Sequence, residues 1–282
     1  MAKPGAAKKS AGVKLDLATI AGLIIAIGAI TGGLVLEGGK ISDITQLTAA
    51  MIVLGGTIGA VMVTTPMSIL IKAAKAFKEV FFETSESLDE RIEEVIALAT
   101  KARKNSIVSL ENDLDNLADP FLKKALSLAV DGADLQDIRK IMELDMVVAD
   151  HRAEAEAKVY EAAGGYAPTI GIIGAVLGLI QVMKHLENIE EVGRGIAVAF
   201  VATVYGVASS NLLFLPVANK IKARSHHMMQ CKELILEGVC SIVEGMNPKL
   251  IRVKLDAFVE AAPTKDNAGA KAAKSAAQTV QA

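Results

Sequence analysis

Four stretches of the chain are apolar over the length that a lipid bilayer requires: residues 15–36, 44–71, 167–183 and 195–218. A membrane-spanning helix needs roughly 17–25 predominantly apolar residues. The pattern therefore predicts an all-α integral membrane protein with four transmembrane helices. A secretory signal peptide is the alternative for the first stretch, because lysines precede it. That stretch is long for a signal peptide, however, and a second one follows closely.

Residues 83–163 have the pattern of soluble helices. "SLDERIEEVIALATKARKN" places Ser87 and Glu90 three apart, as in a capping box, and its apolar residues recur at helical spacing. A shorter helix is predicted from Pro120 and a long one ending at Gly164. Acidic residues outnumber basic ones in this segment. The excess fits either a solvated helical face or an acidic surface for a charged partner.

Basic residues indicate the orientation of the spans. Lysines and arginines gather before the first span, after the second and after the fourth, while the two connecting loops between spans carry few. Positive residues collect on the cytoplasmic side of membrane proteins. Both termini and residues 83–163 are therefore predicted to be cytoplasmic, so the fold has a helical cytoplasmic domain between the second and third spans.

The second apolar stretch is too long for one span, and Pro66 divides it. After Pro66, lysines and apolar residues fall on different sides of a helix, which predicts an interfacial helix on the inner leaflet. The predicted organisation is an N-terminal cytoplasmic tail (1–14), spans one and two (15–66), the interfacial helix (67–82), the cytoplasmic domain (83–163), spans three and four (164–218), a cytoplasmic C-terminal helix (219–260) broken at Asn247-Pro248, and a disordered tail (261–282).

Composition narrows the class of protein. The chain is 52% hydrophobic with 23 glycines and no tryptophan, which fits close helix packing in a membrane. The net charge of −2 gives no bulk attraction to nucleic acid. His227 and Cys231 lie one helical turn apart, but two ligands do not make a zinc site. No enzyme motif is recognisable, so neither an enzymatic activity, nor a metal, nor an organic cofactor is expected.

The third and fourth spans each carry a face of small residues, which lets another helix backbone approach closely. The face of the third consists of Gly171, Gly174, Ala175 and Gly178, and that of the fourth of Ala199, Ala202, Thr203, Gly206 and Ser210. Each span also has a proline near its cytoplasmic side, Pro168 and Pro216. From sequence alone, each proline is either a helix start or kink, or part of a functional site.

No span has an ionisable residue at its centre. Ionisable groups in the membrane mark ion pathways. Either this protein moves no protons, or a second chain supplies the carboxylate. In the second case, the small faces are where the helix of that chain docks.

These residues resemble a known family. "YAPTIGIIGAVLGLIQVM" and "AFVATVYGVASSNLLFLPVANKI" are similar to the third and fourth spans of MotA/PomA-type flagellar stator subunits, and "KARKNSIVSLEND" to their charged cytoplasmic segment. The resemblance covers residues 15–258. ExbB and TolQ proteins share the module of the last two spans, but the two preceding spans favour the flagellar branch.

The resemblance implies a homopentamer in the bacterial inner membrane, in contact with lipid, around two copies of a MotB-type partner. That partner carries the membrane aspartate and anchors to peptidoglycan, and ion flow drives the rotor protein FliG. Arg103 and Glu111 match the charged residues that contact the rotor. The residues expected along the ion path and its coupling are Pro168, Ala175, Ala202, Thr203, Tyr205 and Pro216. Those expected to pack on the partner's helix are Gly171, Gly174, Gly178, Ala199 and Gly206.

The side chains favour protons over sodium as the coupling ion. A dehydrated sodium ion needs oxygen ligands. Sodium-driven members of the family have threonine where this chain has Ala175 and Ala202, so of three hydroxyls only that of Thr203 remains. The alternative for Thr203 is a packing role, with its hydroxyl bonded to its own helix.

Two other functions stay open. An ExbB/TolQ-like energiser would be expected to have three spans, and a solute transporter would be expected to have breaks in the middle of its spans.

Overall fold

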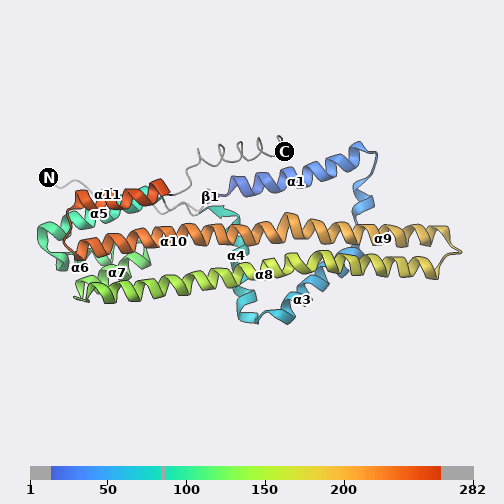
Figure 1. Ribbon diagram of the computed structural model, residues 1–282. Helices are drawn as coiled ribbons and strands as arrows, with labels where there is room; N and C mark the ends of the chain where they lie inside the picture. The colour runs from blue at the N-terminus through green and yellow to red at the C-terminus, as the bar shows by residue number, and fades with distance from the viewer. Residues whose placement is uncertain (1–13, 84–86, 262–282) are drawn as a thin grey trace, which may run out of the picture. The chain divides into compact units, whose positions relative to one another are not determined.

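Figure 1 shows the computed structural model, which describes residues 14–83 and 87–261. Of the two predicted tails, residues 1–13 and 262–282 lie outside the described residues. The chain forms two compact units. We call Met1–Ser85 with His151–Ser225 the span unit, and Glu86–Asp150 with His226–Ala282 the core unit.

Within the described residues, the span unit is helical apart from one two-stranded ladder, in which β1 (Lys14–Leu15) pairs antiparallel with β2 (Phe82–Glu83). Its other elements are α1 (Leu17–Leu36), η1 (Ile41–Ile44), α2 (Leu47–Ala50), η2 (Met51–Gly55), α3 (Gly56–Thr64), α4 (Met67–Val80), the C-terminal part of α8 (Leu135–Lys184), α9 (Ile189–Ala208), η4 (Ser209–Phe214) and the start of α10 (Leu215–Val243). By length and composition, four helices can cross a membrane. The all-α fold with four transmembrane helices is confirmed.

The predicted end of a helix at Gly164 is wrong. α8 runs without interruption through Gly164, Gly165 and Pro168 and is 50 residues long. The fourth span likewise continues through η4, a π-helical turn, into α10, so that 55 residues from Ile189 to Val243 are helical. Glycine and proline disfavour helix interiors by their local properties, and here Gly164 and Pro168 make close contacts with the fourth span and the start of α10.

Pro66 separates α3 from α4, as the sequence predicts, and stands at the N-cap of α4. The apolar face of α4 differs from the expectation. Its buried residues Ala73, Ala76 and Val80 pack against residues of α8 and α10, so this face rests on protein instead of lying free for lipid. Burial of small and β-branched side chains against two long helices stabilises this position of α4.

The core unit is built from α5 (Leu88–Asn105), η3 (Ile107–Leu110), α6 (Glu111–Leu114), α7 (Pro120–Val130), the N-terminal part of α8, the C-terminal part of α10 and α11 (Pro248–Ala261). The predicted helix start at Pro120 and the break before Pro248 are confirmed. The C-terminal helices are not a separate domain, because they complete the same core. Its fully buried large side chains are Ile92, Leu110, Leu122, Leu126, Ile138, Met142, Leu234, Ile235, Ile251 and Leu255.

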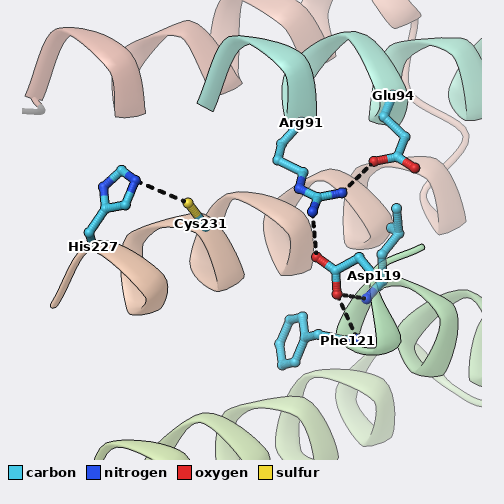
Figure 2. Close-up of polar contacts among 7 residues, drawn as sticks. Arg91, Glu94, Asp119, Phe121, His227 and Cys231 are labelled. Carbon is cyan, nitrogen blue, oxygen red and sulfur yellow. Dashed lines mark hydrogen bonds and ion pairs between the residues drawn. The ribbon is translucent and has the colours of Figure 1, made fainter. Parts of the chain in front are cut away.

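The predicted capping box at Ser87 does not form, since the Ser87 side chain makes no capping hydrogen bond in α5. Instead, Arg91 fixes this end of the unit (Figure 2). Its guanidinium contacts Glu94 at 2.8 Å and Asp119 at 3.5 Å. Asp119 also caps α7, because its Oδ1 accepts the N–H of Phe121 at 2.7 Å. One carboxylate thus joins α5 to the start of α7.

Candidate functional site: the hairpin of α8 and α9

The third and fourth spans pack backbone against backbone. α8 and α9 lie side by side (Figure 1) and are joined by a short turn. A Cβ on Gly178 would lie 2.8 Å from both the amide nitrogen of Ala199 and the carbonyl oxygen of Gly195. A Cβ on Gly206 would lie 2.6 Å from the carbonyl oxygen of Ala167. These separations are shorter than van der Waals contact, so only glycine allows the two helices to come this close.

This packing corrects one expectation from the sequence. The residues expected to receive the partner's helix are already covered within the chain, since they line the contact between α8 and α9. They are Gly171, Gly174, Gly178, Ala199 and Gly206, all of them buried. A small face permits close approach of any helix, and in this chain the neighbouring span occupies it.

Tyr205 and Ala202, two of the residues expected on the ion path, both contact the segment that leads into the second span. The Tyr205 hydroxyl donates to the carbonyl of Ile44 at 2.6 Å and accepts the N–H of Gln46 at 3.2 Å. It therefore fixes the turn before α2. Ala202 is fully buried in a cluster with Ala49 and neighbouring residues of η2 and α9. These contacts occupy one flank of the α8–α9 pair.

The opposite flank of the pair is open. Successive helical residues turn by about 100°. Ala175 therefore lies beside the buried Gly174 on α8, and Thr203 lies beside the buried Ala202 on α9. Because the two helices are antiparallel, both residues point to the same flank. Both are partly exposed. Ile172 is 57% exposed and Val207 48% exposed on the same flank. We call it the open flank: Ile172, Ala175, Leu179, Ile196, Thr203 and Val207.

The Thr203 hydroxyl donates to the carbonyl of Ala199 in its own helix at 3.2 Å, as serine and threonine commonly do in helices. A hydroxyl oxygen that donates its proton can still accept, and Thr203 is partly exposed. Of the residues expected on the ion path, Ala175 and Thr203 thus lie on the open flank, and Ala202 and Tyr205 lie on the flank toward α2.

The two prolines have different surroundings. Pro168 is half-buried within α8, where its Cα would lie 3.2 Å from a Cβ on Gly206. Pro216 is exposed at the second residue of α10. It lines an apolar groove of about 350 Å³ together with residues of α1 such as Gly22 and Leu23. Pro168 therefore belongs to the α8–α9 contact, and Pro216 faces the first span.

A buried carboxylate at the start of α1 escaped the sequence analysis. Asp16 is 6% exposed, accepts the N–H of Thr19 at 3.1 Å and pairs with Lys220 of α10. Its own N–H donates to the carbonyl of Phe81 at 2.9 Å. The hydrogen bond from Lys220 lowers the Asp16 pKa to about 2, despite the opposing effect of burial. An acidic residue just before an apolar run was the only sequence signal for this contact.

Arg103 and Glu111 do not share one helix. Arg103 lies in the last turn of α5 and Glu111 begins α6, and between them Ser106 has a φ of 74°. Both side chains are exposed. Lys101 and Asp113 form an ion pair at 2.5 Å that ties the two helix ends together. Arg103 and Glu111 take part in none of the ion pairs between described residues, so both charges face solvent.

The described residues hold no group of three histidine, cysteine or acidic side chains suited to a metal ion. The His227 Nε2 lies 3.9 Å from the Cys231 Sγ (Figure 2). Both cysteines are buried in the core unit.

Comparison with known proteins shows the family in which this hairpin occurs. Residues 113–234 match the model of the MotA/TolQ/ExbB proton channel family, and residues 20–106 match that of the motility protein A N-terminal region. Motility protein A of Bacillus subtilis is 36% identical over 253 residues, which cover 89% of this chain and 93% of that protein. The second family model covers most of the first span and all of the second, the two spans that distinguish the flagellar branch from ExbB and TolQ proteins.

Two solved structures share the fold. The structure of C. jejuni MotAB matches with a TM-score of 0.83 at 33% identity, covering 86% of this chain and 96% of that one. The flagellar MotAB stator complex from Bacillus subtilis matches with a TM-score of 0.81 at 36% identity, covering 89% and 97%. With its four apolar helices and its tightly packed α8–α9 hairpin, the chain belongs to the MotA/TolQ/ExbB proton channel family as a multi-pass membrane protein of the motility protein A type.

Proposed function

We propose that this chain is the ion-channel subunit of a flagellar stator and that it works together with a MotB-type partner. The observation that carries the proposal is the open flank. It is apolar apart from the Thr203 hydroxyl, and no ionisable side chain lies on it. A helix that brings its own carboxylate would find there a low-dielectric surface with one hydroxyl beside the carboxylate. Both solved structures named above are of MotAB.

In this proposal, five copies of the chain surround two copies of the partner in the bacterial inner membrane. Both termini and the core unit lie in the cytoplasm, as the distribution of basic residues predicts. Arg103 and Glu111 then meet the rotor protein FliG, since their exposed charges have no partner within the described part of the chain. The chain acts through ion flow and mechanical motion, without covalent chemistry.

The coupling ion in this proposal is the proton. Sodium would require several oxygen ligands in place of its water. On the open flank, Ala175 offers none and Thr203 offers one. Ala202 does not bear on the choice of ion in the same way, because it is buried and a hydroxyl at position 202 would face α2 and η2 and not the open flank. Position 175 is therefore the one at which an added hydroxyl bears on ion choice.

The test is to express this chain with its MotB-type partner in a bacterium that lacks stator genes. We expect swimming to be restored, to persist in sodium-free buffer and to stop when a protonophore collapses the proton gradient. A motor that stalls without sodium at constant proton gradient would overturn the choice of ion. Failure to restore any rotation, with both subunits present in the membrane, would overturn the function.

Rotor contact is tested separately with Arg103→Glu. Exposed charges steer and orient partners, so we expect torque to fall while ion conductance through the assembled stator stays unchanged. A charge reversal on the rotor side should restore part of the torque. Lys104→Glu is the matched control, because Lys104 is the neighbouring exposed residue of α5. Equal loss of conductance in Arg103→Glu would place this residue in the ion path.

A further inference from the structure

Pro168 creates a problem that the α8 backbone does not solve by itself. Proline has no N–H, so the carbonyl four residues earlier, that of Gly164, loses its helical donor. α8 nevertheless continues for a further four turns and more, to Lys184. Gly164 is buried, and a buried carbonyl without a hydrogen-bond donor is unfavourable. Some other group must donate to Gly164.

Ser210 supplies that donor. Its Oγ donates to the carbonyl oxygen of Gly164 at 2.7 Å, and Ser210 is only 2% exposed. A helical serine usually returns its proton to its own helix. Neighbouring Ser209 does so, donating to Gly206 at 3.2 Å, and so does Thr203. Ser210 instead donates across to the other span, at the carbonyl that Pro168 leaves open.

Two glycines allow so short a side chain to reach. A Cβ on Gly164 would lie 2.6 Å from Cδ2 of Leu215, and one on Gly206 would lie 2.6 Å from the carbonyl oxygen of Ala167. At Gly164 the Leu215 side chain would have to shift, and at Gly206 the contact is with backbone, so a larger residue there would push the helices apart. A serine hydroxyl, one carbon from its backbone, would then not span the gap. The close glycine packing and the cross-helix hydrogen bond are thus parts of one arrangement.

The position of Ser210 in the fourth span is also unusual. It lies in η4, the π-helical turn that ends immediately before α10, whose second residue is Pro216. A π turn breaks the regular helical register and commonly marks a functional site. The hydrogen bond therefore joins two irregular points, the proline break of α8 and the π turn of the fourth span.

We propose that Ser210 is a positioning residue of the ion-coupling module: its hydroxyl replaces the amide that Pro168 lacks and holds the third and fourth spans together at that break. Movement of α8 at Pro168 is then transmitted through Ser210 to η4 and α10. The proposal rests on the stator function proposed above and adds a residue and a contact to it.

The hydrogen bond is tested by a double-mutant cycle in the purified complex of this chain with its MotB-type partner. We expect Ser210→Ala to lower the thermal midpoint by a few degrees and the control Ser209→Ala to leave it nearly unchanged. Pro168→Ala returns an N–H to position 168, which can bond Gly164. In that background the effect of Ser210→Ala should largely disappear. An undiminished effect would overturn the pairing of Ser210 with the proline break.

The positioning role is tested by torque per stator unit, counted in single motors well below the thermal midpoint. We expect Ser210→Ala to lower torque per unit severalfold, Ser209→Ala to keep it, and Ser210→Thr, which retains the hydroxyl, to restore most of it. Unchanged torque per unit in Ser210→Ala would reduce the residue to packing and overturn the role. The stator function fails separately, if the unmodified pair restores no rotation.

Discussion

The α8–α9 hairpin and the interior of the core unit are both tightly packed, but different residues achieve it. The hairpin contact consists of glycines and alanines that let backbones touch. The core unit buries large side chains such as Leu122, Leu126 and Met142. Water drives the burial of large apolar side chains. Lipid gives no such drive, so helices in a membrane are held by close van der Waals contact and by hydrogen bonds between them.

The polar contacts between helices also differ between the two regions: they are charged in the core unit and mainly neutral in the hairpin. Ion pairs such as Arg139–Glu237 and Arg252–Glu93 join helices of the core unit. Away from the exposed turn, where His185 pairs with Glu191, the third and fourth spans are joined instead by the hydroxyl of Ser210, and the flank toward α2 by that of Tyr205. A neutral hydroxyl needs one acceptor and leaves no charge in a low-dielectric region, where an unpaired charge is costly. The difference predicts how each region responds to substitution.

The largest effect is expected from Gly178→Leu. The new side chain would meet the backbone of Ala199 and Gly195 at 2.8 Å, and backbone cannot yield as a flexible side chain can. We expect α8 and α9 to separate and the protein to be lost from the membrane fraction, measured by immunoblot and by recovery in detergent. Gly165→Leu is the control on the same helix, since no atom lies within 4 Å of its Cβ position. Normal yield of Gly178→Leu would show that the contact is not tight.

An intermediate effect is expected in the core unit. Leu122→Ala leaves a cavity at a fully buried position, and such changes cost about 2–5 kcal/mol. We expect the protein to remain in the membrane fraction, and we expect a lower thermal midpoint for the purified protein, measured by circular dichroism. The exposed Leu250 provides the comparison, because it is 57% exposed and Leu250→Ala should change little. Equal effects of the two variants would contradict a solvent-driven core.

A smaller effect, dependent on pH, is expected at Asp16. Its pKa is about 2 in the folded chain, because Lys220 donates to it, against about 3.9 in an unfolded chain. The contribution of the pair to stability is therefore complete above about pH 4 and is lost as the pH falls toward about 2. Asp16→Asn should lower the thermal midpoint by a few degrees at neutral pH, and the difference from the unmodified protein should vanish in strong acid.

The control for this pH dependence is Asp43→Asn. Asp43 also accepts a backbone N–H, from Lys40 at 2.8 Å, but it is exposed and appears in none of the ion pairs between described residues. We expect a smaller change in its thermal midpoint at neutral pH. A difference between Asp16→Asn and the unmodified protein that persists at pH 2 would mean that the side chain acts by shape and not by charge.

Much of the fold could be predicted from the sequence because bilayer length and helical periodicity act locally. The four spans, the break at Pro66, the helix start at Pro120 and the break before Pro248 follow from apolar length and proline chemistry. The glycines of the third and fourth spans also indicate close packing correctly. The family resemblance rests on these same local signals, and both family models confirm it.

Only the tertiary structure decides what each packed face meets. A run of small residues permits any helix to approach, so the sequence did not show that Gly171 and Gly178 pack on α9 and not on a partner. It did not show that Tyr205 bonds Ile44, 161 residues away in sequence. Gly164, Gly165 and Pro168 suggest a helix end by local preference, yet α8 continues. The donor that replaces the missing amide of Pro168 is Ser210, 46 residues beyond Gly164. Long-range hydrogen bonds of this kind leave no periodic mark along the chain.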